Sequence, residues 1–234
     1  MDDSFRFKRF DVRHGRSSLK VGTDAVVLGA AMTLKPTDKR LLDIGTGCGV
    51  IALMAAQRLD GLDFKITGID IDAASASEAQ ENFAASPWHG RLEASCVPLA
   101  EYAPETPLDV IFSNPPFFEN SLKNPDGRRL MARHTDGLSY RDICAFAAGN
   151  LSAEGRLSLI LPYDSAEALR RCAASFGLHP FRLLTVRTTP SKAPKRLLAE
   201  FSRGRGPVLE DSLVLQDGSE RSPQYTELTK DFYL

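Results

Sequence analysis

The sequence predicts an α/β protein built on a mostly parallel sheet with helices on both faces. Apolar segments typical of strands alternate with helical segments from residue 41 to residue 177. The strand segments are apolar along most of their length, as expected of strands buried on both faces. A glycine-rich segment, 45–49, separates the first of these strands from its helix, and such segments bind ligands at the carboxyl edge of α/β sheets.

The elements can be assigned in order along the chain. Residues 5–13 alternate apolar and basic side chains and predict one half-buried strand. A helix is expected over 23–32, with Thr23 or Asp24 as its N-cap. We expect a seven-stranded main sheet with strands over 41–44, 64–70, 91–97, 108–113, 156–162, 178–188 and 196–204, the last two forming a neighbouring antiparallel pair. Further helices are expected over 50–59, 73–86, 139–151 and 164–177.

Three parts of unequal size are expected. Residues 1–35 form a short N-terminal β/α extension, 36–206 the main domain, and 207–234 a tail of weaker pattern that packs on it. The polar insertion 119–137 is expected to loop over the carboxyl edge of the sheet. The longest apolar runs are too short to cross a bilayer, and no secretory leader is recognisable. The four scattered cysteines indicate reduced thiols, so we expect a cytoplasmic protein without a metal site.

The charge of the chain is unevenly distributed. The net charge is −1, yet residues 1–20 carry +3 and residues 182–205 carry +6. The remainder therefore sums to about −10. Two basic segments on an acidic body suit a polyanionic partner that touches only part of the surface, although solvated lysines and arginines at two edges would give the same pattern.

The glycine-rich loop predicts a bound ligand of a particular charge. Gly45, Gly47 and Gly49 alternate directly after a strand, which allows a tight turn and a close approach of backbone N–H groups to a ligand. A pyrophosphate-binding loop would have glycine in place of Val50. Asp43, just before the loop, would repel phosphate but attract a cation. We therefore expect a cationic ligand without phosphate.

A second acidic residue ends the next predicted strand. Asp70 lies 21 positions after Gly49, where an acid can accept both hydroxyls of an adenosine ribose. Ile71 would cover one side of the adenine ring, and Asp72 is expected to cap the following helix. Together with the loop, these residues point to a ligand that bears ribose and positive charge, and S-adenosylmethionine meets these conditions.

The fourth strand ends in the motif Asn-Pro-Pro-Phe, residues 114–117. Asn114 offers a side-chain carbonyl, and Pro115 fixes the backbone direction while leaving its own carbonyl free. Two acceptors that hold both hydrogens of a planar NH₂ group stabilise the nitrogen as it becomes pyramidal. Phe117 would stack on the ring that bears the amine. The plainer alternative is a strand-ending turn with core phenylalanines.

These motifs resemble those of the class I S-adenosylmethionine-dependent methyltransferases, which have a Rossmann-like fold. Asp43 and the three glycines match the first motif of that family, and Asp70 matches its ribose-binding acid. Asn-Pro-Pro followed by an aromatic residue resembles the signature of enzymes that methylate adenine N6, guanine N2 or glutamine N5. Tyr often follows Pro-Pro in the glutamine enzymes, so Phe favours a nucleobase. Many members hold adenine with an Asp where this chain has Ser95 and Cys96, which leaves the adenine-binding residue unassigned.

The choice of substrate comes from a closer resemblance. Segments 5–32, 132–143, 191–203 and 225–234 resemble bacterial tRNA1(Val) (adenine(37)-N6)-methyltransferases, and the match covers nearly the whole chain. It implies methylation of N6 of adenosine 37, next to the anticodon, in a valine tRNA. Alternatives are an rRNA guanine-N2 methyltransferase, a protein-glutamine N5 methyltransferase, and an RNA-binding relative without turnover.

The resemblance also implies roles for basic residues. Lys20 and Thr23 would lie near the methionine end of the cofactor. We expect a monomer that binds RNA phosphates through a set of basic side chains from three of these segments: Arg9, Arg13, Arg133, Lys192, Lys195 and Arg196.

Overall fold

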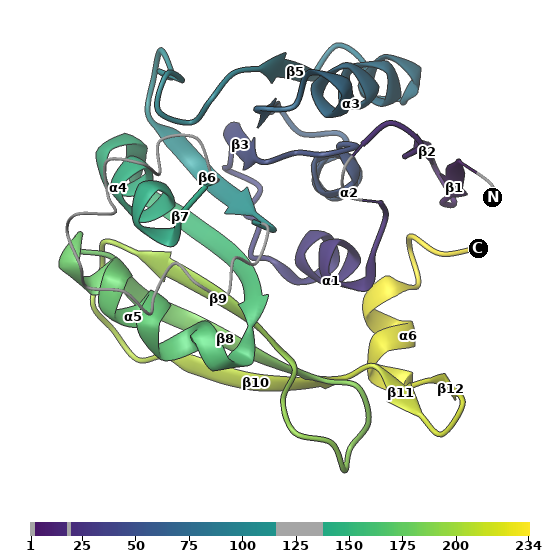
Figure 1. Cartoon of the computed structure of the whole chain (residues 1–234), viewed down its shortest axis with the longest axis vertical. Coiled ribbons are helices and arrows are strands. Elements are labelled where there is room, and N and C mark those ends of the chain that lie inside the picture. The colour runs from purple at the N-terminus through teal and green to yellow at the C-terminus, as the bar shows by residue number, and fades with distance from the viewer. Residues whose placement is uncertain (1–2, 18–19, 116–137) are drawn as a thin grey trace, which may run out of the picture.

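The computed structural model describes residues 3–17, 20–115 and 138–234. Its centre is an eight-stranded sheet of order β10-β8-β9-β7-β6-β3-β4-β5 (Figure 1). The strands of this sheet are β3 (Arg40–Ile44), β4 (Lys65–Asp70), β5 (Leu92–Cys96), β6 (Leu108–Ser113), β7 (Leu151–Pro162), β8 (His179–Arg187), β9 (Arg196–Ser202) and β10 (Leu209–Val214). The helices are α1 (Thr23–Ala31), α2 (Val50–Arg58), α3 (Ala73–Ala85), α4 (Tyr140–Asn150), α5 (Ala166–Ser175) and α6 (Pro223–Thr229).

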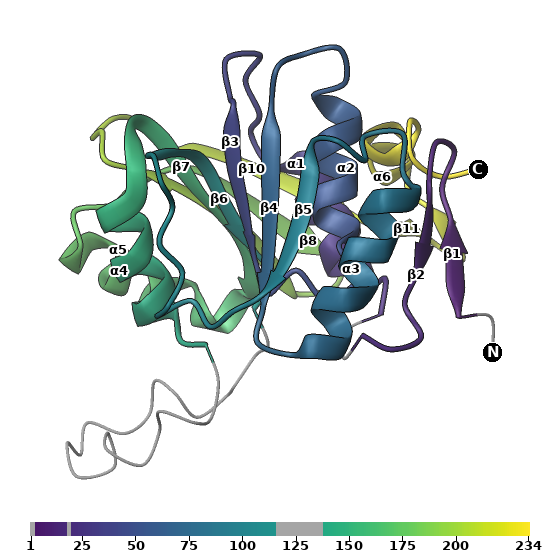
Figure 2. The ribbon, with the colours of Figure 1, turned by 90° about the horizontal axis from the view of Figure 1, so that it is seen from above.

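The sheet separates two hydrophobic cores. Helices α1, α2 and α3 cover one face, and α4 and α5 cover the other (Figure 2). Neighbouring residues of one strand enter opposite cores: Leu41 belongs to the core under α1–α3, and Leu42 to the core under α4 and α5. Side chains that alternate between two buried faces explain why the strands are apolar at consecutive positions. No helix in the described ranges is both long enough and apolar enough to span a membrane.

The strand directions agree with the prediction, but the sheet contains one more strand. β9 pairs antiparallel with both β7 and β8, and the other neighbouring strands pair in parallel. The additional strand is β10, which comes from the tail and pairs with β8 from Leu209–Arg182 to Val214–Arg187. The expected boundary at residues 206 and 207 therefore falls just before a strand of the main sheet.

The N-terminal segment folds as a hairpin, and the prediction of one strand was wrong. β1 (Ser4–Arg6) pairs antiparallel with β2 (Asp11–Arg13), with Phe7 and Phe10 packed in the turn between them. A second small hairpin, β11 (Gln216–Asp217) and β12 (Glu220–Arg221), follows β10. The strands of the first hairpin are held by packing of Phe5 and Val12 on the body of the protein, because so short a pair is not stable alone.

Two predicted boundaries also differ from the structure. The N-cap of α1 is Gly22, and neither Thr23 nor Asp24 caps this helix. β7 begins at Leu151, directly after α4, so the polar residues 152–154 belong to the strand rather than to a loop. A shift in register between Leu108 and Val110 accommodates these residues beside β6.

A buried carboxylate attaches the C-terminal end of α1 to the sheet. Glu200 in β9 is fully buried and accepts hydrogen bonds from Thr33 N at 2.7 Å and Thr33 Oγ1 at 2.8 Å. Ser158 Oγ donates to the same carboxylate at 2.8 Å, and Arg182 Nη1 donates at 2.7 Å. A buried charge is tolerated when its lone pairs are this fully used.

Glu200→Ala should lower the free energy of unfolding by about 3–5 kcal/mol, because it leaves Arg182 as an uncompensated charge in a largely buried position. Denaturant unfolding measures the change. Glu210→Ala, at an exposed position of β10, is the control and should change stability by less than about 0.5 kcal/mol. Equal effects of the two substitutions would contradict the role given to Glu200.

Candidate active site at the carboxyl edge of the sheet

The candidate site lies where the order of the strands reverses. The chain runs from β3 outward through β4 to β5, then returns to place β6 on the other side of β3. Ile44 and Ser113 are paired at the carboxyl ends of β3 and β6, and Ser113 Oγ donates to the Ile44 carbonyl at 2.6 Å. The glycine loop and the Asn-Pro-Pro motif therefore begin side by side, at the kind of switch point where α/β sheets bind ligands.

The glycine loop has the conformation that its glycines permit. Gly45, Gly47 and Gly49 have φ of 69°, 55° and 80°, in the left-handed region. A Cβ atom at Gly49 would lie 2.4 Å from Cε1 of Phe83, so this position is closed to larger residues by packing as well. The glycines thus permit a tight turn that side chains would prevent, and its N–H groups bond within the protein: those of Gly45 and Thr46 donate to the Ile69 carbonyl, and that of Gly49 to the Thr46 carbonyl.

Asp70 is held in place by the loop and by the start of α3. Gly47 N donates to its Oδ2 at 2.9 Å, and Asp72 N donates to its Oδ1 at 2.9 Å. A carboxylate has about four acceptor sites, so two bonds leave capacity for ligand hydroxyls. Asp72 itself accepts from Ser75 N at 2.9 Å, which confirms its predicted role as the N-cap of α3.

Apolar surface is exposed beside Asp70. Ile71 is 68% exposed, unusual for a large aliphatic side chain, at the carboxyl edge of the sheet. Ser95 and Cys96 are exposed at the end of β5, and Cys96 Sγ donates to the Ile71 carbonyl at 3.7 Å. The predicted contact of Ile71 with one side of the adenine ring stays a prediction, and the exposure of the side chain leaves room for it.

Asp43 lies behind the loop and not on its surface. Its side chain is fully buried, and Thr46 Oγ1 donates to its Oδ2 at 2.8 Å. Its Oδ1 has no hydrogen-bond partner among the described residues. The pKa of this carboxyl is raised to about 7, mainly by burial and to a lesser extent by the charge of Asp70, while the hydrogen bond from Thr46 and the backbone of Ala52 oppose the rise. Asp43 would therefore act on a ligand without direct contact, by fixing the conformation of the glycine loop and through the electric field of its carboxyl group.

Asn114 presents an unused acceptor. Its Oδ1 is buried and has no hydrogen-bond partner in the part of the chain that the structure describes. Pro115, which lacks an N–H group, is buried beside it. Buried polar atoms are nearly always paired, so this amide oxygen is an acceptor available to a donor that is not among the described residues.

A cavity of about 760 Å³ brings several predicted residues together. Residues from the N-terminal extension, the Asn-Pro-Pro motif, the β8–β9 region and the tail line it. Among them are six predicted site residues: Lys20, Thr23, Asn114, Pro115, Lys195 and Arg196. Its volume is typical of a ligand site.

Other predicted residues lie elsewhere. Lys192 lines an adjoining hollow of about 400 Å³ together with Lys195 and Arg196. Arg9 pairs with Asp60 at 2.6 Å, near the amino ends of the strands and away from the Asn-Pro-Pro motif. Arg13 lies 4.0 Å from Glu81 on α3. Phe117 and Arg133 fall outside the described residues.

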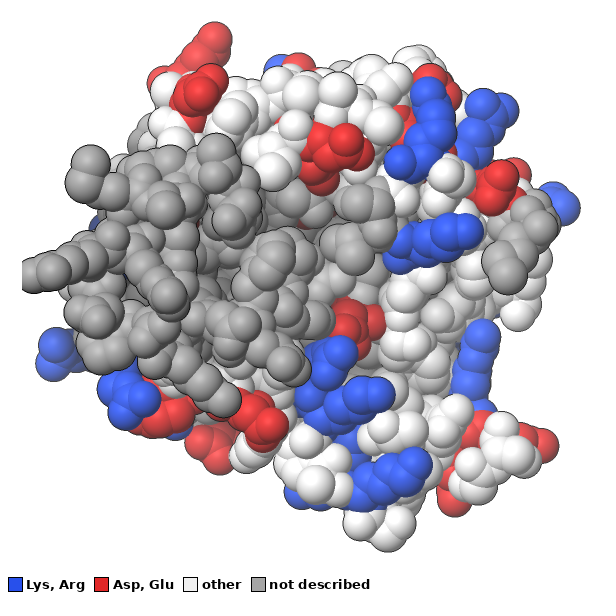
Figure 3. Space-filling model, viewed as in Figure 1, with Lys and Arg blue, Asp and Glu red and all other residues white. Residues whose placement is uncertain are grey.

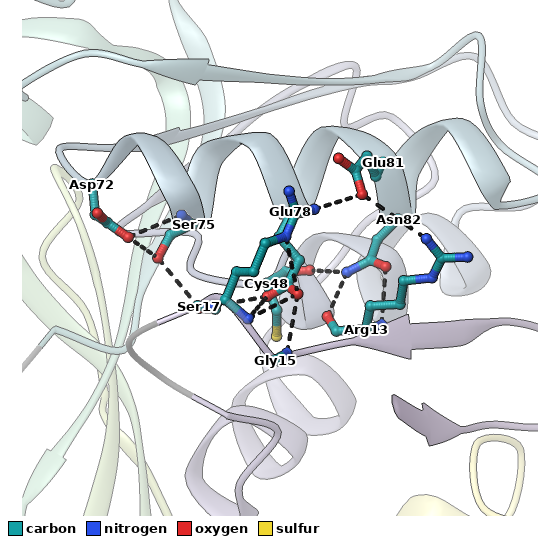
Figure 4. A network of polar contacts seen from close by, with 10 residues as sticks. Arg13, Gly15, Ser17, Cys48, Asp72, Ser75, Glu78, Glu81 and Asn82 are labelled. Atoms are coloured by element: carbon teal, nitrogen blue, oxygen red, sulfur yellow. Dashed lines mark hydrogen bonds and ion pairs between the residues drawn. The ribbon is translucent and has the colours of Figure 1, made fainter. Parts of the chain in front are cut away.

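A second buried carboxylate, which the sequence did not single out, fixes the approach to this cavity. Glu78 of α3 is 2% exposed and accepts backbone hydrogen bonds from Gly15 at 3.0 Å, Arg16 at 3.1 Å and Ser17 at 2.8 Å (Figure 4). One turn later, Asn82 accepts from Arg13 N at 2.9 Å and donates to the Arg13 carbonyl at 2.8 Å. The clamped segment leads directly to Lys20–Thr23 at the cavity wall.

The comparisons with known proteins agree with this site. The Methyltransferase small domain family matches residues 15–161, which contain the glycine loop, Asp70 and the Asn-Pro-Pro motif. The chain is therefore a methyltransferase of the class that carries this domain. It belongs to the family of tRNA1(Val) (adenine(37)-N6)-methyltransferases: it is 40% identical to the Bacteroides fragilis protein of that name over 98% of this chain and 97% of that one. The relative from Trichodesmium erythraeum is 39% identical over 99% and 98% of the two chains.

Solved structures support the same fold. A predicted O-methyltransferase from Agrobacterium tumefaciens superposes with a TM-score of 0.69 and 18% identity, over 89% of this chain and 96% of that one. A methyltransferase from Pyrococcus furiosus gives a TM-score of 0.60 and 20% identity, over 84% and 90%. At these identities the likeness shows the Rossmann-like methyltransferase fold alone.

Glu78→Gln should lower the free energy of unfolding by about 2–4 kcal/mol, because three backbone N–H groups lose a charged acceptor and one faces a new NH₂ group. The matched control is Glu81→Gln, on the same helix. Glu81 is half-exposed and pairs with Arg16 at 2.5 Å, so its loss should cost much less, because solvent screens exposed ion pairs. Denaturant unfolding of both variants tests the difference, and a larger loss in the control would reject the clamp.

The raised pKa of Asp43 should make the stability of the protein depend on pH. Between the ordinary pKa of 3.8 and about 7, the folded chain keeps a proton that the unfolded chain has lost. The contribution of Asp43 to the free energy of unfolding should therefore fall as pH rises, by about 1.4 kcal/mol per unit in that window. Unfolding of wild type and Asp43→Asn from about pH 4 to about pH 8 should show the variant gaining relative stability up to about pH 7. A difference that is constant with pH would contradict the assignment.

Proposed function

We propose that this chain uses S-adenosylmethionine to methylate N6 of adenosine 37, next to the anticodon, in tRNA1(Val). The observation that carries the proposal is the buried, unpaired Oδ1 of Asn114 beside the glycine loop. Family membership supplies the identity of the RNA, because the curated relatives carry this activity in their name. The unpaired Oδ1 of Asn114 can accept a hydrogen bond from the NH₂ group of adenine.

The residues of the loop fit the cofactor. Asp70 is oriented by two backbone donors and retains acceptor capacity for the two ribose hydroxyls. Ile71 offers exposed apolar surface for a face of adenine, and the loop backbone can approach closely because its glycines have positive φ. Lys20 and Thr23, on the cavity wall, would meet the methionine end. When bound, S-adenosylmethionine supplies an electrophilic methyl group on a sulfonium sulfur.

Asn114 and Pro115 would act on the amine. Asn114 Oδ1 accepts one N–H of the adenine NH₂ group, and the carbonyl of Pro115 is the candidate acceptor for the other. Holding both hydrogens favours the pyramidal nitrogen that attacks a methyl group over the planar ground state. The proton leaves the nitrogen after the new N–C bond forms, so no general base is needed before transfer. Phe117 is proposed to stack on the adenine ring.

The exposed cations near the cavity suit the RNA backbone. Lys192 and Lys195 are exposed on the loop between β8 and β9. Arg196 also lines the cavity, but its Nε donates to Asp24 Oδ2 at 2.7 Å, which neutralises part of its charge. We propose that the two lysines contact phosphates and that Arg196 chiefly fixes the start of α1. We also keep as proposed phosphate contacts three arginines outside the β8–β9 loop: Arg9, Arg13 and Arg133.

Asn114→Ala should lower kcat for tRNA methylation by about 100- to 1000-fold, with little change in cofactor affinity, because it removes an acceptor used in the transition state. The measurement is radiolabelled methyl transfer to unmodified tRNA, with cofactor binding followed by calorimetry. Asn150→Ala is the control, since that amide donates to the Phe146 carbonyl at the end of α4, away from the cavity. Unchanged kcat in Asn114→Ala would reject its role.

Digestion of the wild-type product tests the reaction itself. Mass spectrometry should find N6-methyladenosine in the tRNA. N2-methylguanosine in rRNA, a methylated protein glutamine, or RNA binding without any transfer would each contradict the proposed function.

A further inference from the structure

One wall of the cavity is built by the tail. This tail wall consists of Leu215, Gln216, Arg221, Tyr225 and Tyr233, which line the same cavity as the Asn-Pro-Pro motif. The sequence offered no chemical motif in this region, and the only signal was the resemblance of residues 225–234 to a family segment. The wall is nevertheless continuous with the cavity that holds Asn114.

Hydrogen bonds within the tail, and one to the N-terminal hairpin, fix the tail wall. Ser222 caps α6 by accepting from Tyr225 N at 3.0 Å, and Ser222 N donates to the Leu215 carbonyl at 3.0 Å. Tyr225 is buried, and its hydroxyl lies 3.0 Å from that of Tyr233. Lys8 N donates to the Phe232 carbonyl at 2.8 Å, so the end of the chain is also attached to the N-terminal hairpin. The wall is therefore a preformed surface.

The cavity is strongly basic in a chain whose net charge is −1. Five basic residues line it: Lys20, Arg187, Lys195, Arg196 and Arg221. The one acidic residue among the lining residues, Asp24, pairs with Arg196. Figure 3 shows lysine and arginine side chains gathered over the loop between β8 and β9, next to this region. Such a concentration of charge favours an anionic ligand.

Arg221 has the geometry of an anion-binding residue. Its guanidinium carbon lies 3.9 Å from the centre of the Tyr233 ring, a cation–π contact that holds the planar group over the ring. Its side chain is exposed, and no carboxylate of the described residues lies within 4.0 Å of its guanidinium nitrogens. A guanidinium oriented by stacking loses less entropy when it binds a phosphate through two N–H groups.

We propose that the tail wall binds the RNA phosphodiester that flanks the methylated nucleotide, with Arg221 as the phosphate ligand. This inference rests on the proposed function, because Asn114 lines the same cavity. When the adenine base is bound at Asn114, the rest of the cavity is free for the sugar-phosphate backbone of that nucleotide and for a neighbouring nucleotide. Arg187, whose Nη1 donates to the Lys192 carbonyl at 2.8 Å, adds a second positive charge between the tail wall and the β8–β9 loop.

The test compares three variants on unmodified tRNA. Arg221→Gln should raise KM for tRNA about tenfold and make the dependence of binding on salt shallower by about one unit of log–log slope. It should leave KM for the cofactor unchanged and lower the thermal midpoint only slightly, because the side chain is exposed and loses only its contact with the Tyr233 ring. Arg221→Lys keeps the charge but loses the stacked, bidentate geometry, so it should fall between wild type and Arg221→Gln.

The control is Arg40→Gln, an exposed arginine at the amino end of β3, which should match wild type in every measurement. An unchanged tRNA KM and salt slope in Arg221→Gln, with active wild type, would overturn the inference alone. A rise in the cofactor KM instead would assign the wall to the cofactor and also overturn it. Wild type that methylates no tRNA would reject the proposed function itself.

Discussion

The parallel pairing of β4, β3 and β6 is the constraint on which the site depends. Parallel strands bring their carboxyl ends to one edge, and the pairing of Ile44 with Ser113 sets the glycine loop beside the Asn-Pro-Pro motif. On the other side of β3, the same pairing brings Asp70 within reach of Gly47 N. A shift of register would separate three groups that carry the chemistry. The apolar residues on both faces of β3 make such a shift costly.

Two buried carboxylates extend this constraint to the N-terminal extension. Glu78 holds the segment before α1 against α3, and Glu200 holds the end of α1 against β9. Because α1 is fixed at both ends, the residues at its start can form one wall of the cavity although they lie outside the main sheet in sequence. Charged acceptors suit this task, since they hold backbone donors more strongly than neutral groups do. The Asp24–Arg196 pair then joins the start of α1 to the rim of the sheet.

The sequence predicted those features that depend on residues close together in the chain. Consecutive apolar residues identified the buried strands, and the glycines, Asp70 and Asn114 could be placed because each follows such a strand. β10 was missed because it is an edge strand with exposed side chains, held by backbone bonds to β8 rather than by an apolar pattern. The pairing of Arg9 with Asp60 and the clamp at Glu78 join residues far apart in sequence, so no local pattern could reveal them. The tail wall was missed for the same reason.

Two buried acceptors that lack a hydrogen-bond partner among the described residues lie at the switch point of the sheet. Among the described residues, a few buried side-chain atoms lack a partner, and two of them, Asp43 Oδ1 and Asn114 Oδ1, lie at the ends of the adjacent strands β3 and β6. An unsatisfied buried polar atom costs about 1–3 kcal/mol, so the free protein carries a local penalty at its switch point. A ligand that donates a hydrogen bond to Asn114 removes part of that penalty on binding. The cavity thus favours an amine over an apolar ligand of the same shape, because the apolar ligand would leave the amide oxygen both buried and unpaired.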